Sequence, residues 1–416
     1  MQEEKLQALI LYLFEKSPFY KEFFDLNHID ISSIKTLEDL TKIPPISKDE
    51  LQNRNWDFLC VDRNEVIDYT STSGTMGKPV VIGLTEPDLL RLAYNEFSSF
   101  LCADGSAIDT YLLLLTLDRQ FMAGIAYYAG LRKLGAGIIR LGPVIPALQW
   151  ETIQRLQPTA LVAVPSMLLK LHEYAREHNL DLKSSSINKI ICIGENIRMA
   201  DFTMNSLGKK ISEQWNVPLY STYASTEMQT AFTECKAGKG GHLQPDLLIL
   251  EILDDNGFPV ENGHEGEATI TTLGVEGMPL LRFRTGDLCI SHYEKCICGR
   301  TTQRISPVLG RKKQMIKFKG TTIYPHALFD ILDTLKEINC YVVEIYANEI
   351  GNDEIRIHMH LIDYTAINDQ KIRLLVQAKL RVTPELRYTS QEDIHKIQRS
   401  ENNRKPIKLI DKRIKR

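Results

Sequence analysis

Thr72-Ser73-Gly74-Thr75-Met76-Gly77-Lys78-Pro79 is a short loop rich in glycine and hydroxyl groups, set between the strand-like segments 65–69 and 80–83. Glycine lets the backbone approach an anion closely, and the serine, threonine and lysine side chains add hydroxyl donors and one positive charge. This composition favours a loop that binds polyphosphate. A polar hairpin turn is the alternative, because glycine, serine, threonine and proline also dominate turns.

The loop differs from the Walker loop of P-loop nucleotide hydrolases. That motif ends on a second glycine, a lysine and then a serine or threonine whose hydroxyl binds magnesium. Here Thr72 stands at the first glycine position and Pro79 follows Lys78, so the magnesium-binding hydroxyl is missing. We therefore expect a chemistry other than that of P-loop hydrolases.

The composition is that of a globular protein with a large core. The chain has 416 residues, of which 43% are hydrophobic and 25% charged, and its net charge is −3. This length predicts two or three domains, and the charge argues against a protein that binds nucleic acid or a membrane over its whole surface. No apolar run reaches the roughly 18 residues that span a bilayer, and the first residues lack the apolar core of a signal peptide. We expect a cytoplasmic protein with specific, local partners.

The order of hydrophobic patterns predicts the fold class. Helical spacing dominates residues 1–60, and from 109 to 193 apolar runs alternate with amphipathic helices, which predicts a largely parallel sheet covered by helices. Short strands separated by turn residues at 248–290 are typical of hairpins or a barrel. After residue 312 an α+β pattern of about 100 residues has the size of a separate domain. The predicted fold is α/β, with a large N-terminal domain that contains parallel sheets and a small β-barrel-like region, and a small α+β C-terminal domain.

Further motifs follow the loop, and each is weak by itself. Tyr223-Ala224-Ser225-Thr226-Glu227 offers an aromatic ring, hydroxyls and a carboxylate, and Arg284-Thr285-Gly286-Asp287 places an acid on a turn. Gly310-Arg311 leads into the last domain, and Arg404-Lys405-Pro406 lies near the end of the sequence. The order of these motifs is much more specific than any one of them.

In this order the motifs resemble the adenylate-forming superfamily, and nearly the whole chain is most similar to its phenylacetate-coenzyme A ligase branch. In that family a carboxylic acid displaces pyrophosphate from ATP, and a thiol then takes the acyl group from the acyl-adenylate. The resemblance implies that residues 1–311 form an adenylation domain and that residues 312–416 form a mobile domain with the catalytic lysine. It also implies an ATP site between the domains, with ATP, Mg²⁺ and coenzyme A as cofactors.

The resemblance implies roles for individual residues. Lys405 would stabilise the charge that develops when two anions react, and Glu227 would bind Mg²⁺. Asp287 would accept hydrogen bonds from the ribose, and Tyr223 would pack on adenine. The β and γ phosphates would contact Thr72, Ser73, Gly74, Thr75, Gly77 and Lys78. The remaining nucleotide contacts would be Gly194, Glu195, Asn196, Ala224, Ser225, Thr226 and Arg311.

The chain departs from the family pattern at a few positions. Met76 replaces a residue that usually carries a hydroxyl group. Lys313 stands where an acidic residue is frequent, and we take it as the hinge between the domains. Asn403 and Arg404 precede Lys405 where one glycine is expected, so Lys408 is the alternative catalytic lysine.

Cysteine and histidine residues bracket the predicted hairpin region. Three thiolates and one imidazole form a tetrahedral set that suits Zn²⁺, and four protein ligands leave no position for a catalytic water. We therefore expect a structural zinc site. Four unrelated residues, or a thiol pair open to oxidation, are the alternatives. The predicted ligands are Cys235, His242, Cys296 and Cys298.

The sequence says less about which acid is activated and which thiol accepts the acyl group. Segment 121–127 matches the acyl pocket of relatives, with Phe121, Gly124 and Tyr127 as candidate lining residues, although a core helix fits the same pattern. Its aromatic content favours an aryl acid or a modest apolar chain. The partners would be the acid, ATP and coenzyme A, with no nucleic acid and no membrane. A phosphopantetheine carrier or a protein cysteine is the alternative acceptor of the acyl group. A homodimer is left open. The non-enzyme alternative is a zinc-stabilised relative without turnover.

Overall fold

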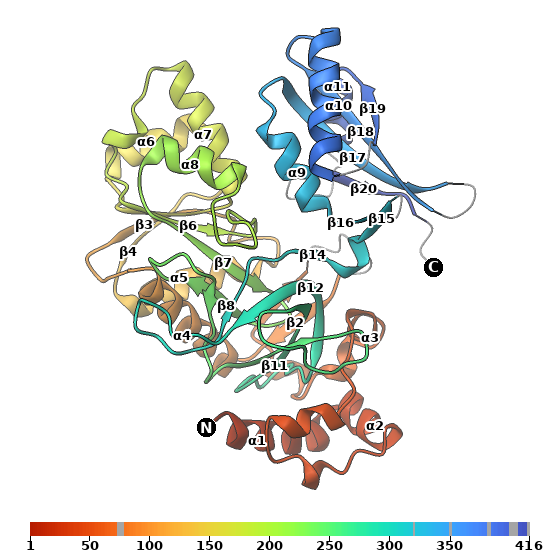
Figure 1. The fold of residues 1–416 in the computed structure, drawn as a ribbon. Helices are drawn as coiled ribbons and strands as arrows, with labels where there is room; N and C mark the ends of the chain where they lie inside the picture. Colours follow the sequence, from red (N-terminus) through yellow and green to blue (C-terminus); the bar gives the residue numbers. More distant parts are fainter. Residues whose placement is uncertain (73–78, 319–320, 349–351, 381–383, 399–406, 414–416) are drawn as a thin grey trace. The chain divides into compact units, whose positions relative to one another are not determined.

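The computed structural model describes residues 1–72, 79–318, 321–348, 352–380, 384–398 and 407–413 (Figure 1). The chain divides into two compact units, Met1–Val308 and Leu309–Arg416. Among the described residues, no helix is both long and apolar enough to cross a membrane. Several predicted site residues lie outside the described residues, namely Ser73, Gly74, Thr75, Gly77, Lys78 and Lys405.

The first unit begins with helices, as the sequence predicted. α1 (Gln2–Lys16) and α2 (Pro18–Leu26) bury apolar side chains such as Leu6 and Tyr20 against the strands that come later in the chain. α3 (Lys48–Asn53) begins at a capping box in which Ser47 and Glu50 satisfy each other's backbone groups. This box fixes where α3 starts, and it therefore sets the position of its first residue, Lys48.

A parallel sheet forms the centre of the first unit. Its strands run in the order β7-β6-β5-β3-β4 and are all parallel. Their bounds are β3 (Thr110–Leu114), β4 (Gly137–Arg140), β5 (Ala160–Ala163), β6 (Lys189–Ile193) and β7 (Leu219–Ser225).

Helices cover both faces of this sheet (Figure 1), because successive residues of a strand point to opposite sides. Leu112 and Leu114 of β3 pack with one group of helices, and Tyr111 and Leu113 pack with the other. The first group is α6 (Pro146–Leu156), α7 (Pro165–Glu177) and α8 (Ser206–Trp215), and the second is α4 (Glu86–Cys102) and α5 (Met122–Leu134). The predicted sheet with helices on both sides is confirmed.

Antiparallel strands continue the sheet beyond β7. The order is β10-β11-β12-β13-β9-β8-β7, so the hairpins predicted for 248–290 are hydrogen-bonded in series with the parallel strands. A separate hairpin of β1 (Asp68–Ser71) and β2 (Val81–Leu84) carries the predicted phosphate loop. The bounds of the others are β8 (Thr230–Glu234), β9 (Gly241–His242), β10 (Leu248–Leu253), β11 (Glu265–Thr272), β12 (Phe283–His292) and β13 (Arg304–Ile305).

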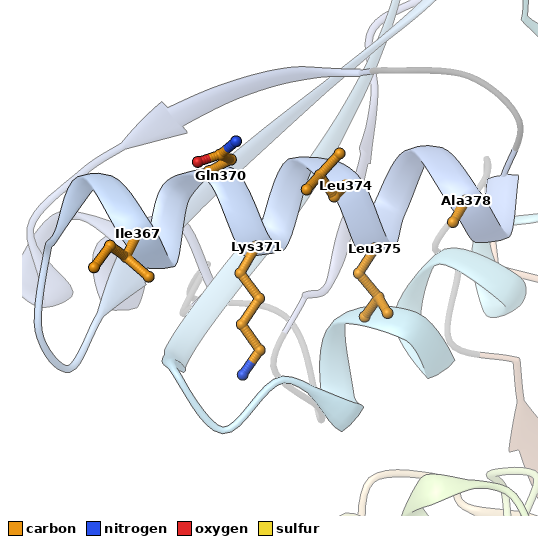
Figure 2. Close-up of a pocket in the computed structure, with 6 residues that line it drawn as sticks. All are labelled: Ile367, Gln370, Lys371, Leu374, Leu375 and Ala378. Atoms are coloured by element: carbon orange, nitrogen blue, oxygen red, sulfur yellow. The ribbon is translucent and has the colours of Figure 1, made fainter.

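The second unit is a small α+β fold with its own apolar core. Its main sheet has the order β19-β18-β17-β20. The strands are β14 (Gly310–Arg311), β15 (Ile316–Phe318), β16 (Thr321–Ile323), β17 (Ile338–Ala347), β18 (Asp353–Leu361), β19 (Glu385–Tyr388) and β20 (Leu409–Asp411). The helices are α9 (Pro325–Thr334), α10 (Ala366–Leu380) and α11 (Gln391–Gln398). A shallow pocket along α10 (Figure 2) is lined by Ile367, Gln370, Lys371, Leu374, Leu375 and Ala378.

Candidate functional site

The predicted adenine and ribose residues meet across the sheet of the first unit. Tyr223 lies on β7 and Asp287 on β12, and the Tyr223 hydroxyl donates a hydrogen bond of 2.9 Å to Oδ2 of Asp287. The ring of Tyr223 stacks on the ring of Phe232, with ring centroids 5.9 Å apart. Burial raises the pKa of Tyr223 well above its usual range, and the charge of Asp287 acts in the same direction. The tyrosine is therefore a neutral donor that orients the carboxylate.

The predicted magnesium residue lies one turn beyond Tyr223. Glu227 follows the end of β7, in a turn where Ser225 Oγ accepts a hydrogen bond of 3.2 Å from the Met228 backbone N–H. Its carboxylate is almost fully buried and forms an ion pair of 2.8 Å with Lys48 Nζ. A buried carboxylate is costly unless a cation compensates it. The ion pair with Lys48 compensates this cost and orients the carboxylate.

Sequence reasoning did not select Lys48. Segment 47–51 has the sequence pattern of a capped helix start, and a lone lysine after such a cap is usually a solvated charge. Its partner is 179 positions away in the sequence. Only the fold brings the two groups together.

Thr72 closes the neck of the predicted phosphate loop. The Thr72 backbone N–H donates to the Val80 carbonyl, and the Val80 N–H donates to Thr72 Oγ1, each over 3.0 Å. The adjoining strands pair Ser71 with Val81. The described residues on either side of the segment 73–78 are thus held together.

The segment Gly194–Asn196 follows β6 at the same edge of the parallel sheet. The Glu195 carboxylate accepts hydrogen bonds from the backbone N–H (2.8 Å) and the hydroxyl (2.9 Å) of Ser166, in the first turn of α7. Asn196 Nδ2 donates to the Val308 carbonyl over 2.7 Å. These side chains hold the loop in place. If the loop contacts the nucleotide base, its backbone would make that contact.

These segments share one edge of the sheet for a topological reason. The start of α7, the Gly194 loop and the Glu227 turn follow β5, β6 and β7, which are parallel neighbours. Ligands of open α/β sheets bind at the carboxyl ends of the strands. The predicted nucleotide-site residues on these loops therefore lie where such a fold binds its ligand.

The predicted acyl segment comes after β3, at the start of α5. Phe121 precedes the first turn, and the Gln120 carbonyl accepts a hydrogen bond of 2.9 Å from Ser71 N–H, which connects this segment to the phosphate-loop hairpin. A Cβ on Gly124 would lie 2.5 Å from the Thr116 carbonyl oxygen, so only glycine fits there. Tyr127 is 3% exposed and contacts Phe100 edge to face in the core. Its position is that of the core helix that the sequence left as the alternative.

In the second unit, Lys408 is engaged in the local structure. Its ammonium lies 3.1 and 3.0 Å from the two carboxylate oxygens of Asp333, and 5.2 Å from the centre of the Tyr341 ring. The Tyr341 hydroxyl donates to Asp333 over 2.8 Å. The hinge candidate Lys313 lies in a short 3₁₀ turn directly after Arg311 of β14. Lys408 thus has a structural role of its own.

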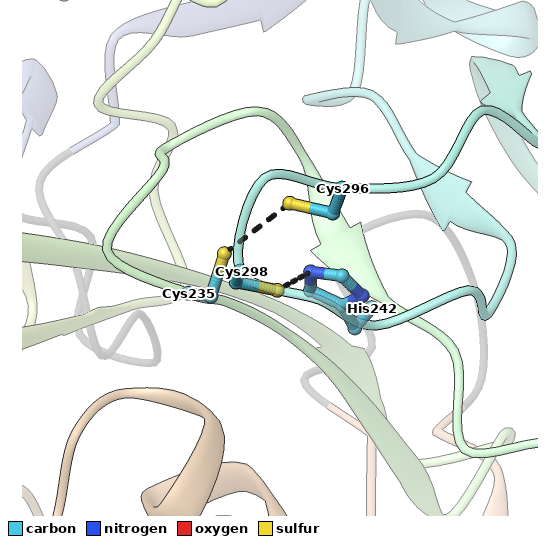
Figure 3. Close-up of side chains that lie close together, drawn as sticks. All are labelled: Cys235, His242, Cys296 and Cys298. Carbon is cyan, nitrogen blue, oxygen red and sulfur yellow. Dashed lines mark hydrogen bonds between the residues drawn. The ribbon is translucent and has the colours of Figure 1, made fainter.

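The predicted metal ligands also come together (Figure 3). One ligand atom from each of the four residues can be chosen so that all lie within 4.8 Å of one another. The Sγ atoms of Cys235 and Cys296 are 3.7 Å apart, and Cys298 Sγ is 3.6 Å from His242 Nε2. Cys235, His242 and Cys296 are buried, whereas Cys298 is partly exposed. Cys102 of α4 packs against this group as a further buried thiol.

Neighbouring groups set the charge and orientation of these ligands. Thr302 Oγ1 lies 3.2 Å from His242 Nδ1, which directs Nε2 to the sulfurs. Burial, followed by the charges of Arg300 and Arg304, lowers the pKa of His242 to about 4. Burial raises the pKa of Cys235 to about 12. Burial also raises the pKa of Cys298, but hydrogen bonds from Arg300 outweigh it and lower that pKa to about 7. The imidazole is neutral, as a metal ligand must be.

Comparisons with known proteins agree with the geometry of the first unit. The family model described as AMP-binding enzyme matches residues 30–276. The phenylacetate-coenzyme A ligase of Thermus thermophilus is 31% identical over 366 residues, which cover 87% of this chain and 81% of that protein. The Escherichia coli phenylacetate-coenzyme A ligase is 25% identical over 393 residues, covering 92% and 87%.

A solved structure shares the fold of the chain. The crystal structure of 2-hydroxyisobutyryl-CoA ligase in the postadenylation state matches with a TM-score of 0.85 at 22% identity, covering 99% of this chain and 88% of that one. At this identity the likeness concerns the fold alone. Together with the family model and the curated relatives, it identifies the chain as a member of the AMP-binding, adenylate-forming enzymes, an AMP-forming acid–thiol ligase of the phenylacetate-coenzyme A ligase branch.

Proposed function

We propose that the chain activates an aryl carboxylic acid with ATP and transfers the acyl group to coenzyme A. The observation that supports this most is the hydrogen bond between Tyr223 and Asp287, one turn from the buried Glu227. This bond joins two separate motifs, the one that contains Tyr223 and Glu227 and the one that contains Asp287, as a nucleotide site of this family requires.

In the first step an oxygen of the acid attacks the α-phosphorus of ATP. The bond from this phosphorus to the bridging oxygen breaks, and pyrophosphate leaves. The loop that begins at Thr72 would hold the β and γ phosphates, and Asp287 would hold the ribose in the orientation set by Tyr223. Lys405 would place positive charge at the reacting phosphate, where it stabilises the transition state more than the ground state.

Glu227 fits the role of a magnesium ligand. Its carboxylate is buried, lies 2.8 Å from the Lys48 ammonium, and is fixed on the turn after β7. Bound Mg²⁺ would neutralise charge on the phosphates.

In the second step the thiol of coenzyme A attacks the carbonyl carbon of the adenylate, and AMP leaves. The residue that supplies positive charge in the first step has no task in this one, so we propose that the second unit rotates at Lys313 between the steps. The engagement of Lys408 with Asp333 supports Lys405 as the catalytic lysine.

The proposal of an aryl acid rests on two observations. The relatives from Thermus thermophilus and Escherichia coli are phenylacetate-coenzyme A ligases. In addition, Phe121 borders the start of α5, next to the hairpin that carries the phosphate loop. An aromatic side chain at this place suits a flat apolar ring.

The cysteine and histidine cluster is proposed to hold a structural Zn²⁺. In a tetrahedral site with Zn–S bonds of about 2.3 Å, two sulfurs are about 3.8 Å apart. The Cys235 and Cys296 sulfurs are 3.7 Å apart, which fits this geometry. Such an ion would tie the segment between β8 and β9 to the turn between β12 and β13.

Incubation of the protein with ATP, Mg²⁺, coenzyme A and a panel of carboxylic acids tests the proposed function. We expect release of pyrophosphate and AMP that depends on the acid and is fastest with aryl acids such as phenylacetate or benzoate. Acid-dependent turnover that prefers aliphatic acids would refute the aryl assignment. The absence of pyrophosphate release with every acid would refute the ligase itself.

A further inference from the structure

Lys48 is the group that faces the candidate magnesium ligand. Its ammonium lies 2.8 Å from Glu227 Oε1, and the lysine side chain is 37% exposed whereas that of Glu227 is 8% exposed. The ammonium therefore belongs to the more exposed side chain of the pair. Because it lies at hydrogen-bond distance from Oε1, a cation that binds this oxygen has to displace it.

The backbone before Lys48 is fixed to the strand that carries Asp287. Ile46 forms a parallel bridge with Phe283 of β12. Its N–H donates to the Arg282 carbonyl over 3.0 Å, and its carbonyl accepts from Arg284 N–H over 2.8 Å. Lys48, two residues later, thus has a defined position relative to the ribose residue.

The segment after Lys48 is fixed to the stem of the phosphate loop. Asn55 Nδ2 donates to the Val81 carbonyl over 2.8 Å, and Val81 N–H donates to Asn55 Oδ1 over 2.9 Å. Val81 begins β2, directly after the neck that Thr72 and Val80 close. Separate contacts therefore connect the Lys48 segment to the candidate metal ligand, to the strand of Asp287 and to β2, the strand that follows the predicted phosphate loop.

We propose that Lys48 is a further residue of the nucleotide site, which pairs with Glu227 in the empty enzyme and contacts the β or γ phosphate when Mg²⁺ takes the carboxylate. This inference rests on the proposed function. A lysine suits such an exchange because it is a compact point charge on a flexible stem, so its ammonium can change partners without movement of the helix. While the ammonium changes partners, the capping box of Ser47 and Glu50 keeps the start of α3 in place.

Kinetics of Lys48→Gln test the proposal. We expect the KM for MgATP to rise about tenfold or more, as the loss of a charge-assisted hydrogen bond implies, while the KM for the acid stays nearly constant. Lys48→Arg should restore most of the affinity for ATP. Lys42→Gln is the matched control, because Lys42 forms an ion pair of 2.7 Å with Asp39 on the same N-terminal segment. A KM for MgATP that changes less than about twofold would overturn the proposal.

Direct binding separates a phosphate contact from a purely structural ion pair. By calorimetry with Mg²⁺ and without any acid, Lys48→Gln should weaken the binding of MgATP and leave the binding of AMP, which lacks the β and γ phosphates, unchanged. Equal weakening of both nucleotides would contradict the proposal, and Lys48→Met, which keeps the apolar stem, repeats the test if the first variant unfolds. This readout needs no turnover. If the wild-type protein releases no pyrophosphate with any acid, the proposed function fails, while the comparison of ATP with AMP still decides the role of Lys48.

Discussion

The Tyr223 hydroxyl donates a hydrogen bond of 2.9 Å to Asp287 Oδ2 and thereby joins β7 to β12. Because this bond orients the carboxylate that would hold the ribose, Tyr223→Phe should raise the KM for ATP about tenfold or more, the cost of one hydrogen bond to a charged group. Steady-state kinetics measure this change. Tyr220→Phe is the matched control, since Tyr220 lies on the same strand and donates to Asp104 over 2.9 Å. Equal effects of the two variants would contradict the role of Asp287.

Replacement of Lys405 and replacement of Lys408, the two candidate catalytic lysines, should have different effects. Lys405→Ala should slow adenylation about a hundredfold or more, because it removes charge from the transition state, and it should affect thioester formation from a synthetic adenylate much less. Lys408→Ala should lower the thermal stability of the protein, since it removes the ion pair of 3.0 Å between Lys408 and Asp333. Single-turnover assays of each half-reaction measure the first effect. Loss of both half-reactions to the same degree in Lys405→Ala would refute its assignment.

Glu96 makes stability depend on pH. Burial raises the pKa of this carboxyl to about 8, although Asn95 donates a hydrogen bond to it. The folded chain therefore holds a proton that the unfolded chain releases near pH 4, so this stabilisation is complete below that value and is lost as pH rises towards 8. Glu96→Gln should remove this dependence, on the order of a few kcal/mol between pH 5 and pH 8.

Thermal or denaturant unfolding at several pH values checks the Glu96 prediction. The slope of stability against pH is the quantity to compare, because a buried amide adds a cost of its own that does not vary with pH. Glu86→Gln, at the start of the same helix, is the control. Parallel pH profiles for the wild type and Glu96→Gln would show that Glu96 does not carry the dependence.

Zinc removal should destabilise the first unit. The purified protein should contain about one zinc ion per chain, and Cys296→Ser should lose the metal and lower the melting temperature. Cys340→Ser, in β17 of the second unit, should change neither value. Elemental analysis and thermal unfolding measure both. Zinc content that is unchanged in Cys296→Ser would contradict the assigned ligand set.

The sequence predicted the sheet of the first unit well, because buried parallel strands such as Ala160–Ala163 are continuous apolar runs. It also predicted that Tyr223, Glu227 and Asp287 belong to one site, since their order along the chain is specific to a family. The sequence did not predict the strand order that brings these three residues together. The connection from β12 through β13 and β9 to β8 depends on pairings such as His242 with Arg304, which no local pattern reveals.

Some side chains have partners that the sequence does not show. Lys48 was missed because its acidic partner is distant in sequence, and Glu195 turned out to hold the first turn of α7 at Ser166. The sequence left Tyr127 open between an acyl pocket and a core helix, because a helical pattern does not distinguish a side chain in the core from one that faces a ligand. Long-range packing decides such cases.

The fate of oxygen in the acid tests the central claim most directly. If the chain forms an acyl-adenylate, an acid labelled with ¹⁸O in its carboxylate gives one labelled oxygen to AMP, because the acid oxygen that attacks the α-phosphorus stays on it. Mass spectrometry of the AMP after turnover with coenzyme A measures this. We predict ¹⁸O in AMP and none in pyrophosphate. Unlabelled AMP, or label that appears in inorganic phosphate, would contradict an adenylate-forming mechanism.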